Sequence, residues 1–212
     1  MEVTLRRLRL KFTKRLLTHR IFSFPIWAHN KFQSPSPYAI KCQVLKRYGI
    51  EETSWIETGT YLGETTRFLA KNYPSVLSLE PSIPHFQYGF SKFRKNRKVK
   101  LINKTSEEFF ETALLSFNEK INIYLDGHAS GDGTFTGVSR TPIRHELEMI
   151  AIHRSRFNEL FVAIDDFRVF KNTEGTYPTN HFLVDFCKLY GFEWTVEQDI
   201  FLFWLRESKK LK

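Results

Sequence analysis

The sequence has little cysteine, and this excludes two classes of protein. Only Cys42 and Cys187 occur in 212 residues. Two thiols this far apart can build neither a disulfide framework nor a cysteine-rich zinc site. We therefore expect two reduced, buried thiols in a reducing compartment.

Long apolar runs are also missing. The longest uncharged stretch near the N-terminus is Ile21 to Ala28, and Pro25 interrupts it. It is too short for a membrane-spanning helix and lacks the pattern of a secretory signal peptide. No internal repeats occur, and 42% of the residues are hydrophobic. We expect a cytoplasmic protein with one globular domain.

The body of the chain lacks an excess of charge of either sign, although the whole sequence carries a net charge of +9. Residues 1–20 contribute +6 and residues 206–212 contribute +3, so residues 21–205 are neutral. This distribution disfavours nucleic acid as a partner of the domain body. The basic N-terminal arm also carries apolar residues at helical spacing, namely Leu5, Leu8, Phe12 and Leu16. Such an arm can contact an anionic membrane surface or a protein, or it can pack as an ordinary helix.

From residue 38 onward, short apolar runs alternate with amphipathic segments. The predicted strands are Ser54–Thr58, Val76–Glu80, Val99–Ile102, Ile121–Asp126, Leu160–Asp165, Glu193–Val196 and Ile200–Leu205. The predicted helices are 38–48, 63–73, 83–95, 106–117, 141–155 and 179–190. This alternation predicts a parallel α/β sheet covered on both faces, with the last two strands forming a hairpin at its edge. We divide the chain into an arm with a Pro/Ser hinge, 1–37, and one domain, 38–212.

A glycine turn follows the first predicted strand, in the segment Glu57-Thr-Gly-Thr-Tyr-Leu-Gly63. Gly59 permits a positive φ and the close approach of a ligand, and Gly63 lets the next helix begin close to the strand. The spacing differs from the Gly-x-Gly-x-x-Gly of dinucleotide-binding proteins. Glu57 would repel a pyrophosphate and suits a cationic ligand.

The second and third strands also end in polar residues. Glu80 ends the second strand, where a carboxylate can accept hydrogen bonds from both hydroxyls of a ribose. The third strand leads into the loop Asn103-Lys-Thr-Ser-Glu107, in which Ser106 is the predicted helix cap. All these positions fall at the carboxyl edge of the sheet, where ligands bind in such folds.

Together these motifs resemble the cofactor motifs of class I S-adenosylmethionine-dependent methyltransferases. The resemblance covers the chain from about residue 38 and implies a Rossmann-like fold with a mostly parallel seven-stranded sheet, a C-terminal antiparallel hairpin and helices on both faces. It implies that Glu57 and Gly59 approach the methionine part of the cofactor, Glu80 the ribose, and the Thr105-Ser106 loop the adenine. The cofactor-binding positions it implies are Glu57, Thr58, Gly59, Tyr61, Gly63, Glu80, Thr105, Ser106 and Asp126.

Acidic residues end the fourth and fifth predicted strands. If these strands are neighbours, Asp126, Asp165 and Asp166 converge at one edge. Three such carboxylates either take up protons or bind a cation, and oxygen ligands favour Mg²⁺. The metal ion could hold two substrate oxygens and lower the pKa of a hydroxyl. The alternative is that these aspartates are caps and a solvated pair.

The aspartates are also similar to those of the Mg²⁺-dependent O-methyltransferases that modify macrolide (macrocin) and aminocoumarin sugars. By this resemblance Asp126, Asp165 and Asp166 are metal ligands. That family has Asp-Gly-Asp where this chain has Asp126-Gly-His128, so His128 falls on the position of the proposed general base. A histidine can act as a base near neutral pH. The glycine-rich loop 129–137 would cover the site, with Phe135 contacting the acceptor.

The sequence therefore predicts an O-methyltransferase that uses S-adenosylmethionine and Mg²⁺ on a small polyhydroxylated acceptor. A sugar or glycan intermediate is favoured by family analogy. One alternative is a catalytically silent cofactor-binding or interaction module, in which the aspartates would point apart. An NAD-dependent dehydrogenase is disfavoured by Glu57, and a nucleic-acid methyltransferase by the neutral body and the lack of an Asn/Asp-Pro-Pro-aromatic motif. Whether the chain forms homo-oligomers stays open.

Overall fold

The computed structural model describes residues 23–127, 141–171 and 177–206. The basic arm 1–20, the predicted base His128 and the predicted covering loop 129–137 therefore lie outside the described residues. Both cysteines are buried and free of disulfides. No described helix has the length and apolar character needed to cross a membrane.

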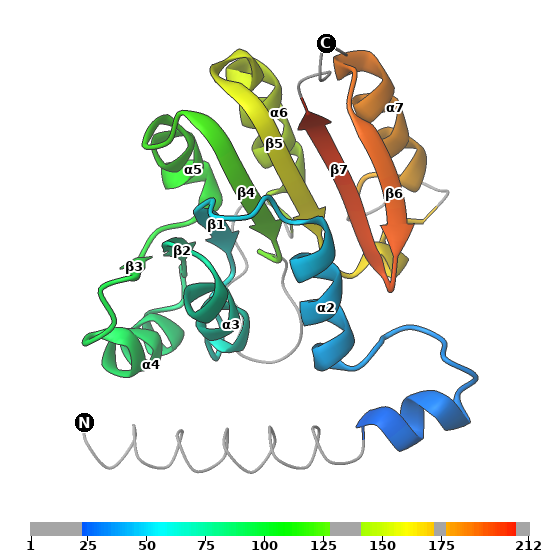
Figure 1. The fold of residues 1–212 in the computed structure, drawn as a ribbon, viewed down its shortest axis with the longest axis horizontal. Helices are drawn as coiled ribbons and strands as arrows, with labels where there is room; N and C mark the ends of the chain where they lie inside the picture. Colours follow the sequence, from blue (N-terminus) through cyan, green and yellow to red (C-terminus); the bar gives the residue numbers. More distant parts are fainter. Residues whose placement is uncertain (1–22, 128–140, 172–176, 207–212) are drawn as a thin grey trace.

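Seven strands form a single sheet in the order β3-β2-β1-β4-β5-β7-β6 (Figure 1). The first five strands pair in parallel, whereas β7 runs antiparallel to both β5 and β6. This confirms the predicted sheet and its terminal hairpin. The strands are β1 Trp55–Thr58, β2 Val76–Leu79, β3 Val99–Ile102, β4 Glu119–Leu125, β5 Phe157–Ile164, β6 Glu193–Glu197 and β7 Ile200–Arg206.

Helices cover both faces of the sheet because its strand side chains alternate between two buried clusters. Trp55 packs in a cluster with residues of α2 and α3, and Ile56 packs in the other with residues of α5, α6 and α7. Both side chains are fully buried. The helices are α2 Tyr38–Tyr48, α3 Glu64–Asn72, α4 Ile83–Phe93, α5 Ser106–Leu115, α6 Ile143–His153 and α7 Asn180–Tyr190.

The cap of α5 differs from the prediction. Thr105, not Ser106, is the N-cap residue, and it forms a capping box with Glu108. Thr105 Oγ1 accepts a hydrogen bond from the Glu108 N–H at 3.3 Å, and Glu108 Oε2 accepts one from the Thr105 N–H at 3.1 Å. The acidic residue three positions after Thr105 completes the box, which Ser106 with Phe109 could not do.

The carboxyl ends of β1, β4 and β5 point to the same edge of the sheet, at the bottom of Figure 1. Helix α2 lies at this edge, and residues 23–29 form a further helical segment before it. Parallel strands bring the residues that follow them together, so this edge gathers the predicted site residues.

Candidate functional site

The turn after β1 requires both of its glycines. Gly59 has a φ of 85°, and a Cβ at this position would lie 2.3 Å from the carbonyl oxygen of Asp126. Gly63 has a φ of 65° and caps α3, and a Cβ there would lie 2.5 Å from the ring of Phe93. Only glycine allows such a conformation and such close contact together. The turn therefore packs directly on the end of β4.

Glu57, at the base of this turn, is fully buried. Its Oε2 atom accepts hydrogen bonds from Ser78 Oγ at 2.5 Å and from Thr66 Oγ1 at 2.6 Å. Its Oε1 atom has no hydrogen-bond partner among the described residues. Burial raises the pKa of Glu57 to about 7, although the two hydroxyl donors act in the opposite direction. A buried oxygen without a donor is costly, so this atom fits a ligand that brings one.

Glu80 follows β2 and is held by backbone donors. Its Oε2 atom accepts the Tyr61 N–H at 2.7 Å, and its Oε1 atom accepts the Ser82 N–H at 2.9 Å. Burial raises the pKa of Glu80, and these two hydrogen bonds oppose the shift. Each carboxylate oxygen can accept a second hydrogen bond. The carboxylate is therefore oriented and still able to accept from a pair of hydroxyls.

The hydroxyls of the Thr105-Ser106 loop make internal contacts. The Thr105 hydroxyl caps α5, and Ser106 Oγ donates a hydrogen bond to Glu146 Oε1 at 2.7 Å. Glu146 is buried on α6, and burial raises its pKa to about 7. The Tyr61 ring is exposed and lies 4.9 Å from the ring of His85. The hydroxyls of Thr105 and Ser106 are therefore both engaged in hydrogen bonds within the fold.

The structure brings Asp126, Asp165 and Asp166 together. All three line a pocket of about 410 Å³ at the carboxyl edge of β4 and β5. Burial and the nearby Asp165 raise the pKa of Asp126 well above its usual range. Asp166 adopts a left-handed conformation with a φ of 55°, which aspartate tolerates better than most residues.

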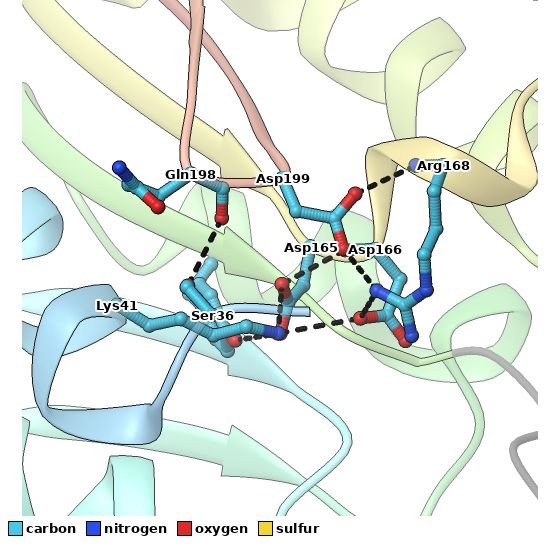
Figure 2. Close-up of polar contacts among 8 residues, drawn as sticks. Ser36, Lys41, Asp165, Asp166, Arg168, Gln198 and Asp199 are labelled. Carbon is cyan, nitrogen blue, oxygen red and sulfur yellow. Dashed lines mark hydrogen bonds and ion pairs between the residues drawn. The ribbon is translucent and has the colours of Figure 1, made fainter. Parts of the chain in front are cut away.

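Lys41 occupies the space between two of these carboxylates and was not predicted as a site residue. Its Nζ atom lies 2.6 Å and 2.7 Å from the two oxygens of Asp165, and 3.2 Å from Asp166 Oδ1 (Figure 2). Burial lowers the pKa of this lysine, but the surrounding aspartates outweigh burial and raise it. The ammonium is thus held in its charged form.

Asp165 has two further donors. The hydroxyl of Tyr124, a fully enclosed residue of β4, donates to Asp165 Oδ2 at 2.6 Å, and the Asp166 N–H donates to Oδ1 at 2.8 Å. With Lys41 contacting both oxygens, each Asp165 oxygen has two partners, which matches the capacity of a carboxylate. In residues 23–127, 141–171 and 177–206, no group of His, Cys, Asp or Glu is arranged to hold a metal ion. The donor set as it stands does not fit Mg²⁺.

Arg168 and the β6–β7 turn hold the other side of the cluster. The Arg168 guanidinium contacts Asp166 Oδ1 at 2.8 Å and also pairs with Asp199 (Figure 2). The Asp199 carboxylate accepts the Arg168 N–H at 2.8 Å as well. The neighbouring Gln198 carbonyl accepts a hydrogen bond from Ser36 Oγ at 3.4 Å. The terminal hairpin therefore links the acidic cluster to the segment that precedes α2.

That segment forms a wall of the pocket. Trp27 and Pro35 of this segment line it, as do Tyr38 at the start of α2, Asp126 and Asp165. A pocket lined by aromatic residues, carboxylates and an ammonium suits a small polar molecule with an apolar face. The residues before 38, predicted only as an arm and hinge, thus contribute to the site.

No protein-family model and no curated protein sequence matches the chain. Among solved structures, a proposed rRNA methylase from Clostridium thermocellum is similar, with a TM-score of 0.54 at 12% identity over 80% of this chain and 96% of that one. A precorrin 8w decarboxylase from Methanobacterium thermoautotrophicum has a TM-score of 0.50 at 9% identity over 82% of this chain and 92% of that one. At such identities the likeness concerns the fold alone. The chain has the Rossmann-like fold found in methyltransferases.

Proposed function

We propose that the chain is an S-adenosylmethionine-dependent methyltransferase that methylates a hydroxyl of a small polyhydroxylated acceptor. The observation that carries the proposal is the pair of buried glutamates, Glu57 and Glu80, at the ends of adjacent strands around the Gly59 turn. A carboxylate at the first position disfavours a pyrophosphate and suits a cationic amino acid group.

The described residues fit the cofactor in three ways. Glu57 Oε1 is buried without a donor and suits the methionine part of the ligand. Glu80 is oriented to accept from the ribose hydroxyls. The Gly59 turn lets the ligand approach the backbone closely. When bound, S-adenosylmethionine supplies a methyl group on a positively charged sulfur, and this charge would favour the ionised form of the neighbouring Asp126, whose pKa burial raises.

The pocket beside this edge is the proposed acceptor site. Its volume of about 410 Å³ suits a small molecule, and the charged side chains among its lining residues suit hydroxyl groups. A sugar or glycan intermediate is our favoured acceptor class. The acceptor hydroxyl must lose its proton as the carbon–oxygen bond forms, and His128 stays the predicted base for that proton.

The sequence predicts a role for Mg²⁺ at the aspartates, and the position of Lys41 argues against this prediction. An ion bound by Asp165 would have to displace the Lys41 ammonium, which contacts both oxygens of that carboxylate. Charged lysine and a divalent cation repel each other at such distances. We therefore propose methyl transfer without assigning a step to a metal ion.

Calorimetric titration with S-adenosylmethionine tests the proposed function. We expect saturable binding to the wild-type chain and affinity reduced by about tenfold in Glu80→Gln, because the amide nitrogen cannot accept a ribose hydroxyl. The matched control is Glu107→Gln, which changes an exposed glutamate at the start of α5 and should bind as the wild type does. Absence of any binding to a folded wild-type chain would rule the proposal out.

A further inference from the structure

We propose that Lys41 is the resident cation of the aspartate cluster and replaces a divalent metal ion there. Its Nζ atom lies within 3.2 Å of three carboxylate oxygens from Asp165 and Asp166. The side chain is only 15% exposed, so the ammonium is held in place and is not a solvated surface charge. A cation bound by these carboxylates occupies the position that a metal ion would need.

The hydrogen bonds of Asp165 support this assignment. Lys41, Tyr124 and the Asp166 N–H together provide two donors for each Asp165 oxygen. Metal ligation uses the same lone pairs. Since Tyr124 lies on the same sheet and is buried, its hydroxyl cannot move aside without leaving a buried polar group unpaired.

Asp166 is held in the same way. Its Oδ1 atom accepts from Lys41 at 3.2 Å and from the Arg168 guanidinium at 2.8 Å. Arg168 is itself bound by Asp199 of the β6–β7 turn. Two fixed cations therefore flank this carboxylate. An added metal ion would face the repulsion of both.

The consequence for the reaction rests on the proposed function. The Lys41 ammonium makes three hydrogen bonds to aspartate oxygens, so Lys41 is a positioning residue for the carboxylates that line the proposed acceptor pocket. Together Lys41 and Arg168 supply fixed positive charge beside the pocket. Methyl transfer at this site then requires no divalent metal ion.

A Mn²⁺ titration followed by electron paramagnetic resonance tests the assignment without any need for activity. We expect no saturable Mn²⁺ binding to the wild-type chain. Lys41→Met replaces the ammonium with an apolar group of similar length and frees the carboxylates, so this variant should bind Mn²⁺ saturably, with an affinity on the order of tenfold or more above any residual binding to the wild type. Adding Asp165→Asn to Lys41→Met should remove the gained binding, because it removes one ligand charge.

Two results would overturn the assignment. One is saturable Mn²⁺ binding to the wild-type chain that Asp165→Asn abolishes, which would mean that the ion displaces Lys41. The other is a folded Lys41→Met chain that binds no more Mn²⁺ than the wild type does. Lys41→Ala serves as the second variant, and the wild-type titration decides alone if neither variant folds. A chain that fails to bind S-adenosylmethionine would refute the proposed function and leave the Mn²⁺ result standing.

The reaction itself provides a second measurement. Once methyl transfer to an acceptor is measured, the wild-type rate should be the same in excess EDTA as in Mg²⁺. A rate that EDTA abolishes and Mg²⁺ restores would contradict the role assigned to Lys41.

Discussion

Among single residues, Glu146 has a special position because it is a buried carboxyl on α6 that contacts the Thr105-Ser106 loop. It accepts a hydrogen bond from Ser106 Oγ at 2.7 Å. Burial raises its pKa from 4.5 to about 7. The folded chain thus keeps a proton on Glu146 over a pH range in which the unfolded chain releases it. Because the folded state binds more protons there, stability falls as pH rises from about 4.5 to about 7.

Glu146→Gln should make the stability of the chain less dependent on pH. The amide can still accept from Ser106 but does not ionise. Between pH 4.5 and about 7, ionisation of Glu146 should lower the free energy of unfolding of the wild-type chain by up to about 3 kcal/mol, at about 1.4 kcal/mol per pKa unit. The variant should not show this loss. Urea unfolding at a series of pH values measures the difference. Glu148→Gln, at an exposed position of the same helix, is the control and should leave the slope unchanged. If the free energy of unfolding changes with pH equally in Glu146→Gln and in the wild type, the raised pKa of Glu146 is contradicted.

At the scale of an element, α5 begins with a capping box that competes with the predicted cofactor role of its first residues. The Thr105 hydroxyl accepts the Glu108 N–H and satisfies a donor that the helix leaves open. Helix capping alone therefore accounts for a threonine at position 105, without any contact to a ligand. The resemblance to methyltransferases, in contrast, implies an adenine contact at the same position.

Thr105→Ala should lower the free energy of unfolding by about 1 kcal/mol, because the cap is lost. The control is Thr112→Ala in the exposed middle of the same helix, where alanine favours the helix and stability should be equal or slightly higher. Chemical denaturation without cofactor measures both. If Thr105→Ala keeps full stability and loses only cofactor affinity, the capping interpretation is wrong.

At the scale of the whole molecule, the carboxyl edge of the sheet gathers the ends of β1, β2 and β4, so a ligand bound at the proposed cofactor site would connect the central strands of the sheet. A ligand that binds only the folded chain stabilises it by about 2.7 kcal/mol at a hundredfold excess over Kd. For a domain of this size each kcal/mol raises Tm by about 2–4 °C. S-adenosylmethionine at that excess should therefore raise Tm by about 5–10 °C.

NAD⁺ is the matched comparison ligand in the same thermal denaturation. It should leave Tm unchanged, because Glu57 at the turn repels a pyrophosphate. A rise in Tm with NAD⁺ and none with S-adenosylmethionine would favour the dehydrogenase alternative. If neither ligand changes Tm, neither the methyltransferase nor the dehydrogenase is supported.

The local elements of the fold were predictable because their causes are local. The predicted bounds of α2 and of β3 agree with the structure, since periodic apolar residues and flanking polar residues mark both. The positive φ of Gly59 and Gly63 follows from the need for a tight strand-to-helix turn. The predicted start of β4, Ile121, is two residues late because Glu119 and Lys120 are charged. Both residues pair with β5 although they are exposed. Backbone hydrogen bonds, not side-chain burial, extend the strand there.

By itself the sequence determined the order of the strands and helices, the glycine turn and the acids at the strand ends. Only the tertiary structure decided what the aspartates bind to, because Lys41 reaches Asp165 from 124 residues away. Along the chain Lys41 is one polar residue of an amphipathic helix. Its position over the cluster depends on how Val44 and Leu45 of α2 pack in the buried cluster that also contains Phe161 of β5, and that long-range packing has no signature within a short stretch of sequence.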